Sequence, residues 1–536
     1  MADETQAGAA YAASGATNPW LVALVVAFAA FMEVLDTTIV NVALPHVAGS
    51  LGVSVDEASW VVTTYLISNA AALVASPFFG RWLGRKTFFI TCLALFTAAS
   101  VACGFAWNLE VLLLSRILQG LGGGGMVPVS QSILAETFPP ENRGQGFAMF
   151  GVAVVVAPVI GPILGGWLTE NWSWHWCFLI NGPVGLIAIA LIASTLRQSA
   201  AAVAEARRRL RQEGGFDLVG FLLVATFLGS LEIMLDRGLI DDWFDSSFIV
   251  TVAIICCLAF ALMVPWELSR RSPMIDLRMV GTRQFGSCFI IMLAAGGTLL
   301  ATTQFLPLLV QNEFGYTAVW AGLILTPGGL VAMGMMFVVG YLSGRIQPKY
   351  LIAIGTLIVA FSMHILTAVY GDLDFWFFAI SRMVLSVGLP LVFLPIITAS
   401  YEGIAPDKTD QASALINSAR NTGGSIGISL TANIVAHREQ FHHSRLVENV
   451  VPSNISFQDT VQQVMSYFIG RGSSPQEAQG QVIAWIGDQV QTQATFLAYV
   501  DAFWVLMLMS LAVIPLALML RNTPLGTRRG AGSHPA

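Results

Sequence analysis

The stretch "FMEVLDTTIVNVALP", residues 31–45, places two carboxylates, Glu33 and Asp36, inside an otherwise apolar run. An acidic side chain at the centre of a membrane span costs about 2.5–3.5 kcal/mol on insertion scales. The two acids are three residues apart, so they share one face of a helix. Such a cost predicts that both acids face protein rather than lipid and have a function there.

The composition predicts a membrane protein. Of the 536 residues, 55% are hydrophobic and 11% are charged, whereas a soluble domain carries about 25% charged residues. The net charge of −6 and the lack of a basic stripe argue against a nucleic-acid partner. The six cysteines fall in or beside apolar runs without CxxC spacing, which is typical of small buried hydrophobes.

Apolar segments long enough to cross a bilayer follow one another through the chain, and we count fourteen. They lie near residues 20–45, 57–79, 87–107, 109–136, 144–169, 175–196, 215–236, 246–267, 284–312, 317–341, 348–370, 374–402, 410–436 and 497–520. Most basic residues fall in loops on one side of this arrangement, which predicts that this side and both termini are cytoplasmic.

These spans divide the chain into five parts. We expect a cytoplasmic tail at 1–19, a six-helix bundle at 20–196, a linker with inserted spans 7 and 8 at 197–283, a second six-helix bundle at 284–520, and a tail at 521–536. The second bundle includes a long outer loop, 437–496, whose stretch "VQQVMSYFIG" (461–470) has apolar residues at helical spacing. That stretch predicts an amphipathic helix, which either lies on the membrane surface or docks a partner.

The two bundles resemble each other in sequence. "SRILQGLGG" at Ser115–Gly123 is similar to "SRMVLSVGL" at Ser381–Leu389, an offset of 266 positions. The same offset relates Gly161 to Gly427, and an offset of 264 relates Gly80 to Gly344. Parallel repeats of this kind are common in transporters. They predict two halves that face each other across a central cavity.

Several motifs carry a family resemblance. They are "LDTTIVNVALP" (35–45), "RILQG" (116–120), "GPILGG" (161–166), "LEIMLDRGLIDDWF" (231–244), "SARNTGGSIG" (418–427) and "HREQFHHSRL" (437–446). Together they resemble the 14-span drug:proton antiporters of the major facilitator superfamily, the EmrB/QacA type, and the EmrB-like members in particular. The resemblance covers nearly the whole chain and implies an all-α major facilitator fold.

The chain departs from that family's pattern in two places. The loop between spans 2 and 3 keeps Gly84, Arg85 and Lys86, a conformational motif of the family, but Arg81 stands where an acidic residue is usual. This puts a lock between an acid and a helix dipole in doubt. Glu232 stands where glutamine is expected.

Three groups of residues are candidates for function. Asp36, Glu33 and Arg116 are candidates for proton coupling, because a buried carboxyl group can load and release a proton near neutral pH and Arg116 carries a permanent charge beside it. A structural ion pair, or an arginine that ties backbone carbonyls together, are the alternatives. Polar and aromatic residues inside spans are candidates for substrate contact: Asn41, Tyr65, Asn69, Gln119, Gln304, Phe305, Gln311, Asn417 and Asn421. Candidates for close packing and bending in span 5 are Pro158, Gly161, Pro162, Gly165 and Gly166.

The expected function follows from these residues and the resemblance. We expect a proton-coupled exporter of hydrophobic or cationic toxic compounds that works by alternating access and is not an enzyme. The sequence shows no phosphate-binding Gly-Lys-Ser/Thr loop and no metal-ligand motif, so no cofactor or metal is expected. The resemblance implies the inner membrane of a Gram-negative cell, with a periplasmic membrane-fusion adaptor and an outer-membrane channel as partners. Alternatives are a dedicated exporter of one metabolite or self-made toxin, and a membrane receptor without transport.

Overall fold

The computed structural model describes residues 18–139, 142–212, 215–270, 273–405 and 408–522. Every regular element within these ranges is a helix, and they contain no strand. The predicted all-α fold is therefore confirmed. Nearly all of the two predicted tails, 1–19 and 521–536, lies outside the described residues.

The first half of the chain forms eight helices that correspond to the first six predicted spans. They are α2 (Pro19–Leu51), α3 (Val55–Leu83), α4 (Arg85–Gly104), α5 (Leu109–Gly123), α6 (Met126–Thr137), α7 (Arg143–Asn171), α8 (Trp176–Leu179) and α9 (Asn181–Thr195). Local sequence sets several boundaries. Ser54 and Glu57 form a capping box at the start of α3, and Gly52 ends α2 in the left-handed region at φ 69°.

The inserted segment and the second half follow. The insertion holds α10 (Ala200–Gln212), α11 (Leu218–Arg237), the short 3₁₀ helix η1 (Trp243–Asp245), α12 (Ser247–Ser269) and α13 (Leu277–Val280). The second half holds α14 (Arg283–Phe314), α15 (Ala318–Leu342), α16 (Pro348–Leu366), α17 (Phe375–Ser400), α18 (Thr409–Val447), α19 (Ile455–Gly470), α20 (Pro475–Ala512) and α21 (Ile514–Leu518).

Twelve segments of the described chain are long and apolar enough to cross a membrane. The two predicted spans that do not meet this criterion are also helical: one is the pair α5 and α6, and the other is α18. Both carry polar residues that face other helices, among them Arg116 in α5 and Asn417 in α18, which are buried. Counting these two with the twelve gives the fourteen spans that the sequence predicts.

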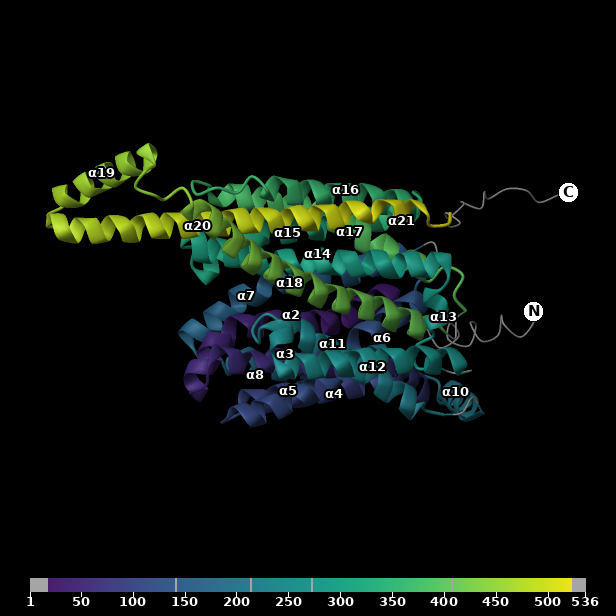
Figure 1. Cartoon of the computed structure of the whole chain (residues 1–536). Helices are drawn as coiled ribbons and strands as arrows, with labels where there is room; N and C mark the ends of the chain where they lie inside the picture. Colours follow the sequence, from purple (N-terminus) through teal and green to yellow (C-terminus); the bar gives the residue numbers. More distant parts are fainter. Residues whose placement is uncertain (1–17, 140–141, 213–214, 271–272, 406–407, 523–536) are drawn as a thin grey trace.

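The two halves repeat the same helix pairings. In the first half α2 packs on α7, α3 packs on α5, and α4 packs on α5. The second half repeats this with α14 on α18, α15 on α17, and α16 on α17. Figure 1 shows the second half above the first. Helix α11 packs on α3, and α12 packs on α11. The predicted relation between the bundles is thus present in the packing of the helices.

The outer segment is more helical than a long loop. Helix α18 continues to Val447 and α20 begins at Pro475, so these two helices extend well beyond the predicted spans 410–436 and 497–520. Helix α19 contains the predicted amphipathic stretch and packs on α20. Figure 1 shows α19 and the start of α20 projecting from one end of the molecule, whereas α10, α13 and α21 lie at the other end. We call α19 with the projecting parts of α18 and α20 the outer hairpin, and the opposite end the basic end, since α10 carries Arg207, Arg208 and Arg211.

Candidate functional site

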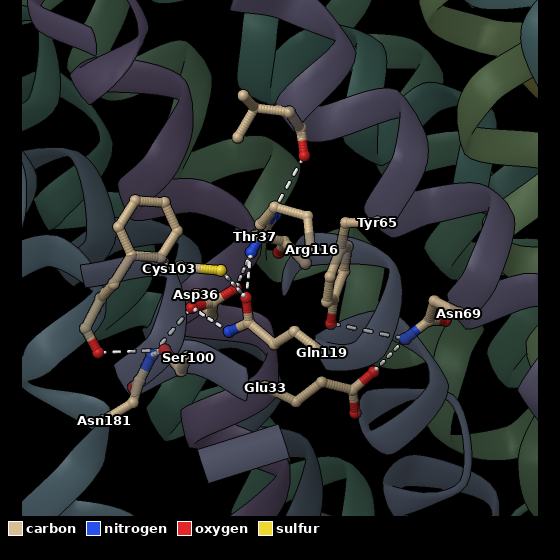
Figure 2. Close-up of polar contacts among 12 residues, drawn as sticks. Glu33, Asp36, Thr37, Tyr65, Asn69, Ser100, Cys103, Arg116, Gln119 and Asn181 are labelled. Carbon is tan, nitrogen blue, oxygen red and sulfur yellow. Dashed lines mark hydrogen bonds and ion pairs between the residues drawn. The ribbon is translucent and has the colours of Figure 1, made fainter. Parts of the chain in front are cut away.

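Asp36 lies at the centre of a buried network of polar side chains in the first half (Figure 2). Its side chain is fully buried in α2. Arg116 Nη1 donates to Asp36 Oδ2 at 2.7 Å. Gln119 Nε2 and Asn181 Nδ2 each donate to Asp36 Oδ1 at 2.8 Å. All three partners are donors, which suits an ionised carboxylate.

Arg116 contacts four groups, three through hydrogen bonds and one through an aromatic ring. Besides the bond to Asp36, its Nη1 donates to Gln119 Oε1 at 2.7 Å and its Nε donates to the Val61 carbonyl at 3.0 Å. The ring of Tyr65 lies 4.2 Å from the guanidinium carbon, a distance at which a cation–π interaction stabilises the charge. The Nη2 atom is buried, and no residue in the described part of the chain bonds to it. Arg116 therefore pairs with Asp36 and also binds a backbone carbonyl, as both interpretations of this residue expected.

Glu33 lies one helical turn before Asp36 and is held more weakly. Its Oε1 atom accepts a hydrogen bond from Asn69 Nδ2 at 3.1 Å, and the same Nδ2 lies 3.4 Å from the Tyr65 hydroxyl. Glu33 Oε2 is buried and has no hydrogen-bond partner among the described residues. A carboxyl group with one free oxygen can exchange a proton while breaking fewer hydrogen bonds than Asp36 would.

Small residues let the helices of this network approach closely. A Cβ atom on Gly122 of α5 would lie 2.5 Å from the backbone nitrogen of Phe96 in α4. A Cβ atom on Gly165 of α7 would lie 2.8 Å from the carbonyl oxygen of Ile39 in α2, and one on Gly161 would collide with Thr38. Gly166 has only Val42 nearby, at 4.0 Å. Two of the three span-5 glycines therefore bring α7 against α2 inside the first half.

Both prolines of span 5, Pro158 and Pro162, lie inside the single helix α7. On this helix the contact between the halves is made chiefly with α15, and to a smaller extent with α17. A Cβ atom on Gly329 would lie 2.8 Å from Val159, and one on Gly322 would lie 3.3 Å from Ile163. At the interface between the halves, glycines of α15 therefore pack closely against α7, at Val159 and Ile163, which lie beside the two prolines.

The candidate substrate residues do not gather in one place. Tyr65, Asn69 and Gln119 belong to the buried network described above. Asn417 lines a cavity between the halves, and Asn421 accepts a hydrogen bond from Arg420. The remaining four are dispersed: Asn41 and Gln304 are exposed, Phe305 lies in the hydrophobic core of the second half, and Gln311 donates to the Pro307 carbonyl of its own helix.

The cavity has walls from both halves. Its open space is about 890 Å³, including the part that opens to solvent. Helices α6 and α7 form one wall, and α14, α15, α17 and α18 form the others. The walls are mostly apolar, with Phe147, Phe150 and Phe393 among them. The charged residues that line it are Arg382 and Arg420.

Polar contacts join the halves at the basic end. Arg85, at the start of α4, donates through Nε and Nη2 to Asp410 of α18, both at 3.0 Å, and also pairs with Glu136. Asn417 Nδ2 donates to Gln131 Oε1 at 2.7 Å, and the Ser413 hydroxyl donates to the same oxygen at 3.0 Å. The halves are therefore in contact at this end.

The other two residues of the predicted loop motif, Gly84 and Lys86, contact residues near the end of the first half. Gly84 has φ 81°, and a Cβ atom on it would collide with the side chain of Gln198. Lys86 Nζ donates to the Ala193 carbonyl at 2.7 Å. Of the motif, Arg85 is the residue that reaches the second half.

Sequence reasoning missed some of these residues. Asn181, which donates to Asp36, and Ser100, which accepts from Asn181 at 3.0 Å, are polar residues in apolar spans, and that signal could have found them. Asp410 and Glu136, the partners of Arg85, could not be recognised, because nothing local in the sequence connects residues that are 325 positions apart.

The fold and this site define a multi-pass membrane protein with two related helical halves, a buried charge network in one half and a cavity between them. Residues 26–428 match the family model of the Major Facilitator Superfamily, and the chain belongs to that family.

Relatives cover almost the whole chain. It is 32% identical to the multidrug export protein EmrB of Escherichia coli K12 over 486 residues, 90% of this chain and 92% of EmrB. It is also 32% identical to the fatty acid resistance protein FarB of Neisseria gonorrhoeae over 520 residues, 97% of this chain and 99% of FarB. The crystal structure of the human organic anion transporter MFSD10 has the same fold, with a TM-score of 0.55, 13% identity, and coverage of 92% of this chain and 99% of that one.

Proposed function

We propose that this protein is a multidrug efflux transporter that uses the proton gradient to export toxic small molecules by alternating access. Relatives at 32% identity over 90% of the chain are multidrug export proteins. The observation that carries the proton coupling is the buried pair of acids on one face of α2, with Asp36 bound to Arg116 and Glu33 left with a free oxygen. Charged groups inside a membrane span are costly and therefore point to a function.

The proposed cycle uses the difference between the two acids. Glu33 exchanges a proton with the solvent when its side of the protein opens, because its carboxyl group has only one bond to break. Asp36 and Arg116 form a pair whose charges balance. A change in the charge of Glu33 shifts that balance through a chain of contacts, from Asn69 to Tyr65 and from Tyr65 to Arg116. The contacts of Arg85 with Asp410 close the basic end and must break when the cavity opens there.

The location and the partners are part of the same proposal. We assign the basic end to the cytoplasm, since basic residues favour the cytoplasmic side, and place the protein in the inner membrane with both termini cytoplasmic. The outer hairpin then projects into the periplasm, where it docks a membrane-fusion adaptor that leads to an outer-membrane channel. Its exposed apolar side chains support docking, among them Ile455, Ile483 and Trp485.

Transport in proteoliposomes tests this function. Purified protein is reconstituted with a pH-sensitive dye inside, a proton gradient is imposed, and ethidium is added on one side. We expect ethidium to accumulate against its gradient while protons move in the opposite direction, and we expect Asp36→Asn to stop both movements. Ethidium movement without proton movement would reject proton antiport.

A further inference from the structure

Arg382 is the counterpart of Arg116 in the second half. The offset of 266 positions relates Arg116 in α5 to Arg382 in α17, and these helices occupy matching places in the two halves. The same offset relates Asp36 to Thr302 of α14. The contacts agree with this relation, because Arg382 donates to the hydroxyl groups of Thr302 at 3.4 Å and Thr303 at 3.0 Å.

The second half has an arginine at the position of Arg116, but it has no residues equivalent to those that neutralise Arg116 in the first half. By the offset of 266, Leu299 stands in place of Glu33, Thr302 in place of Asp36 and Leu385 in place of Gln119. By the offset of 264 for α3 and α15, Gly329 stands in place of Tyr65. Arg382 is 6% exposed, and among the described residues it forms no ion pair.

The space next to Arg382 is part of the cavity between the halves. Arg382, Leu299 and Gly329 all line it, so positions that correspond to an acid and a tyrosine in the first half are an apolar wall and an open space here. A second arginine, Arg420 of α18, lines the same cavity, and its hydrogen bonds go to the side-chain oxygen of the neighbouring Asn421. Glu33 acts on Arg420 electrostatically but forms no ion pair with it. The described lining therefore contains two guanidinium groups and no carboxylate.

We propose that Arg382 and Arg420 form a binding site for the acidic group of an amphiphilic organic anion, whose apolar part lies against the phenylalanines of the cavity. A buried guanidinium without a counter-ion binds a carboxylate or sulfonate through charge-assisted hydrogen bonds. The inference rests on the proposed efflux function and extends its cargo from hydrophobic and cationic compounds to anionic ones. The ligand supplies the negative charge that Asp36 supplies in the first half.

Two probes with the same ring system and opposite charge test the site. Anthracene-9-carboxylate is an anion at pH 7.5, and 9-(aminomethyl)anthracene is a cation, so fluorescence anisotropy with purified protein in a non-ionic detergent gives both affinities. We expect Arg382→Gln and Arg420→Gln each to weaken binding of the carboxylate by about tenfold or more, the order of one charged hydrogen bond. Binding of the amine should stay the same or improve, which also shows that the variants are folded.

Two matched variants at position 302 test whether the site depends on the lack of an acid beside Arg382. Thr302→Asp restores the acid of the first half and should neutralise Arg382, so that binding of the carboxylate falls as it does in Arg382→Gln. Thr302→Asn has the same shape without the charge and should bind the carboxylate within about threefold of the unmodified protein. The site is rejected if the unmodified protein binds no carboxylate, or if both arginine variants bind it as tightly as the unmodified protein.

Transport separates this inference from the proposed function. If proteoliposomes export ethidium in exchange for protons while the carboxylate does not bind, the efflux function stands and the anion site is wrong. If the carboxylate binds in an Arg382-dependent manner while neither ethidium nor the carboxylate is exported in exchange for protons, the anion site stands and proton-driven efflux is wrong.

Discussion

At the scale of single residues, two acids that lie on one face of α2, Glu33 and Asp36, differ in their hydrogen bonds. Asp36 accepts hydrogen bonds from three donors, one of which is the cation Arg116, whereas Glu33 has one donor and one oxygen without a partner among the described residues. Replacing Asp36 leaves a buried Arg116 without its counter-ion, while replacing Glu33 removes a group that is only partly bonded. The two substitutions should therefore differ in their effect on stability as well as on transport.

The first prediction concerns the pair formed by Asp36 and Arg116. Asp36→Asn and Arg116→Gln should each lower the free energy of unfolding, by up to about 3–5 kcal/mol, because each leaves a buried charge unpaired. The double variant should be more stable than either single variant, since it contains no unpaired charge. Thermal unfolding of the purified proteins measures this. Strictly additive losses would show that the two residues do not depend on each other.

The second prediction concerns Glu33. Glu33→Gln keeps the shape of the side chain and its contact with Asn69, so the melting temperature should change little, by the equivalent of about 1 kcal/mol or less. Proton release on adding ethidium to purified protein, followed with a pH-sensitive dye, should nevertheless be lost. Asn69→Ala serves as a control that removes the contact and leaves the acid. Full proton release from Glu33→Gln would show that another acid carries the proton, and Glu232 would be the next to test.

Much of this network could be predicted from sequence, and the reason is local. Glu33, Asp36 and Arg116 are charges in apolar spans, and the cost of burying them marks them individually. Their separate bonding states could not be predicted, because these depend on Asn69 and Asn181, which come from other helices. Arg382 and Arg420 were visible in the same way, but the lack of an acid beside them emerges only from the packing of α14, α15 and α17.

At the scale of helices, every predicted span is helical in the structure, but two helices are longer than predicted. The mixed composition of α18 and of the first part of α20 resembles a polar loop, so both helices were predicted to end at the membrane. In the structure, α19 packs on α20, and Ala478 and Val482 are buried residues of α20. Ser474 and Glu477 form a capping box that starts α20. Packing and capping sustain these helices where hydropathy gives no signal.

The third prediction concerns the outer hairpin. Ile483→Glu and Trp485→Glu together place charge on exposed positions of α20 that lie outside the bundle, at 64% and 40% exposure. Drug resistance of cells should fall to the level of cells without the gene, because an adaptor no longer docks. Binding of ethidium to the purified variant should be unchanged, since neither position lines the cavity.

A matched variant of the same helix controls for the added charge. Gln481→Glu with Gln489→Glu also adds two acids at exposed positions of α20, but it keeps the apolar side chains of Ile483 and Trp485. This control should retain resistance. Full resistance in cells that carry the Ile483→Glu and Trp485→Glu variant would reject docking at this face.

The inserted helix α11 connects the two halves. Arg237 donates to the Asp56 carbonyl of α3 at 2.8 Å, and Asp236 accepts from Thr63 of the same helix. Glu232 accepts from Ser425 of α18 at 2.8 Å. The C-terminal part of α11 thus contacts both α3 and α18, a role that its position in the sequence did not reveal.

At the scale of the whole molecule, the contact of Arg85 with Asp410 joins the halves at the basic end. Arg81 stands where an acid is usual, which puts the lock between an acid and a helix dipole in doubt, so a contact of another kind would have to hold the halves together here. The bidentate pair of Arg85 with Asp410, together with Glu136, is such a contact. Its side chains are 16% and 8% exposed, so its strength should lie between that of an exposed and that of a buried ion pair.

The fourth prediction concerns this pair. Asp410→Asn should shift the population towards a state that is open at the basic end, by about 1–3 kcal/mol. A cysteine introduced at Ser413, which bonds Gln131 across the interface, should then react faster with a membrane-permeant maleimide in a background without the native cysteines. The swap Arg85→Asp with Asp410→Arg should slow the reaction again. Equal labelling rates in all variants would show that the pair does not hold this end closed.

The length of α20 has a mechanical consequence. Its 38 residues span about 57 Å at 1.5 Å per residue, and a bilayer core is only about 30 Å thick. No proline interrupts the helix after its first turn, so it is a stiff rod fixed at one end in the second half. In the proposed alternating-access cycle the halves rock against each other, so a rod fixed in one half should act as a lever whose tip is displaced farther than its base. Opening of the transporter should therefore produce a large displacement of the outer hairpin, and a protein bound there would experience that displacement once in every cycle.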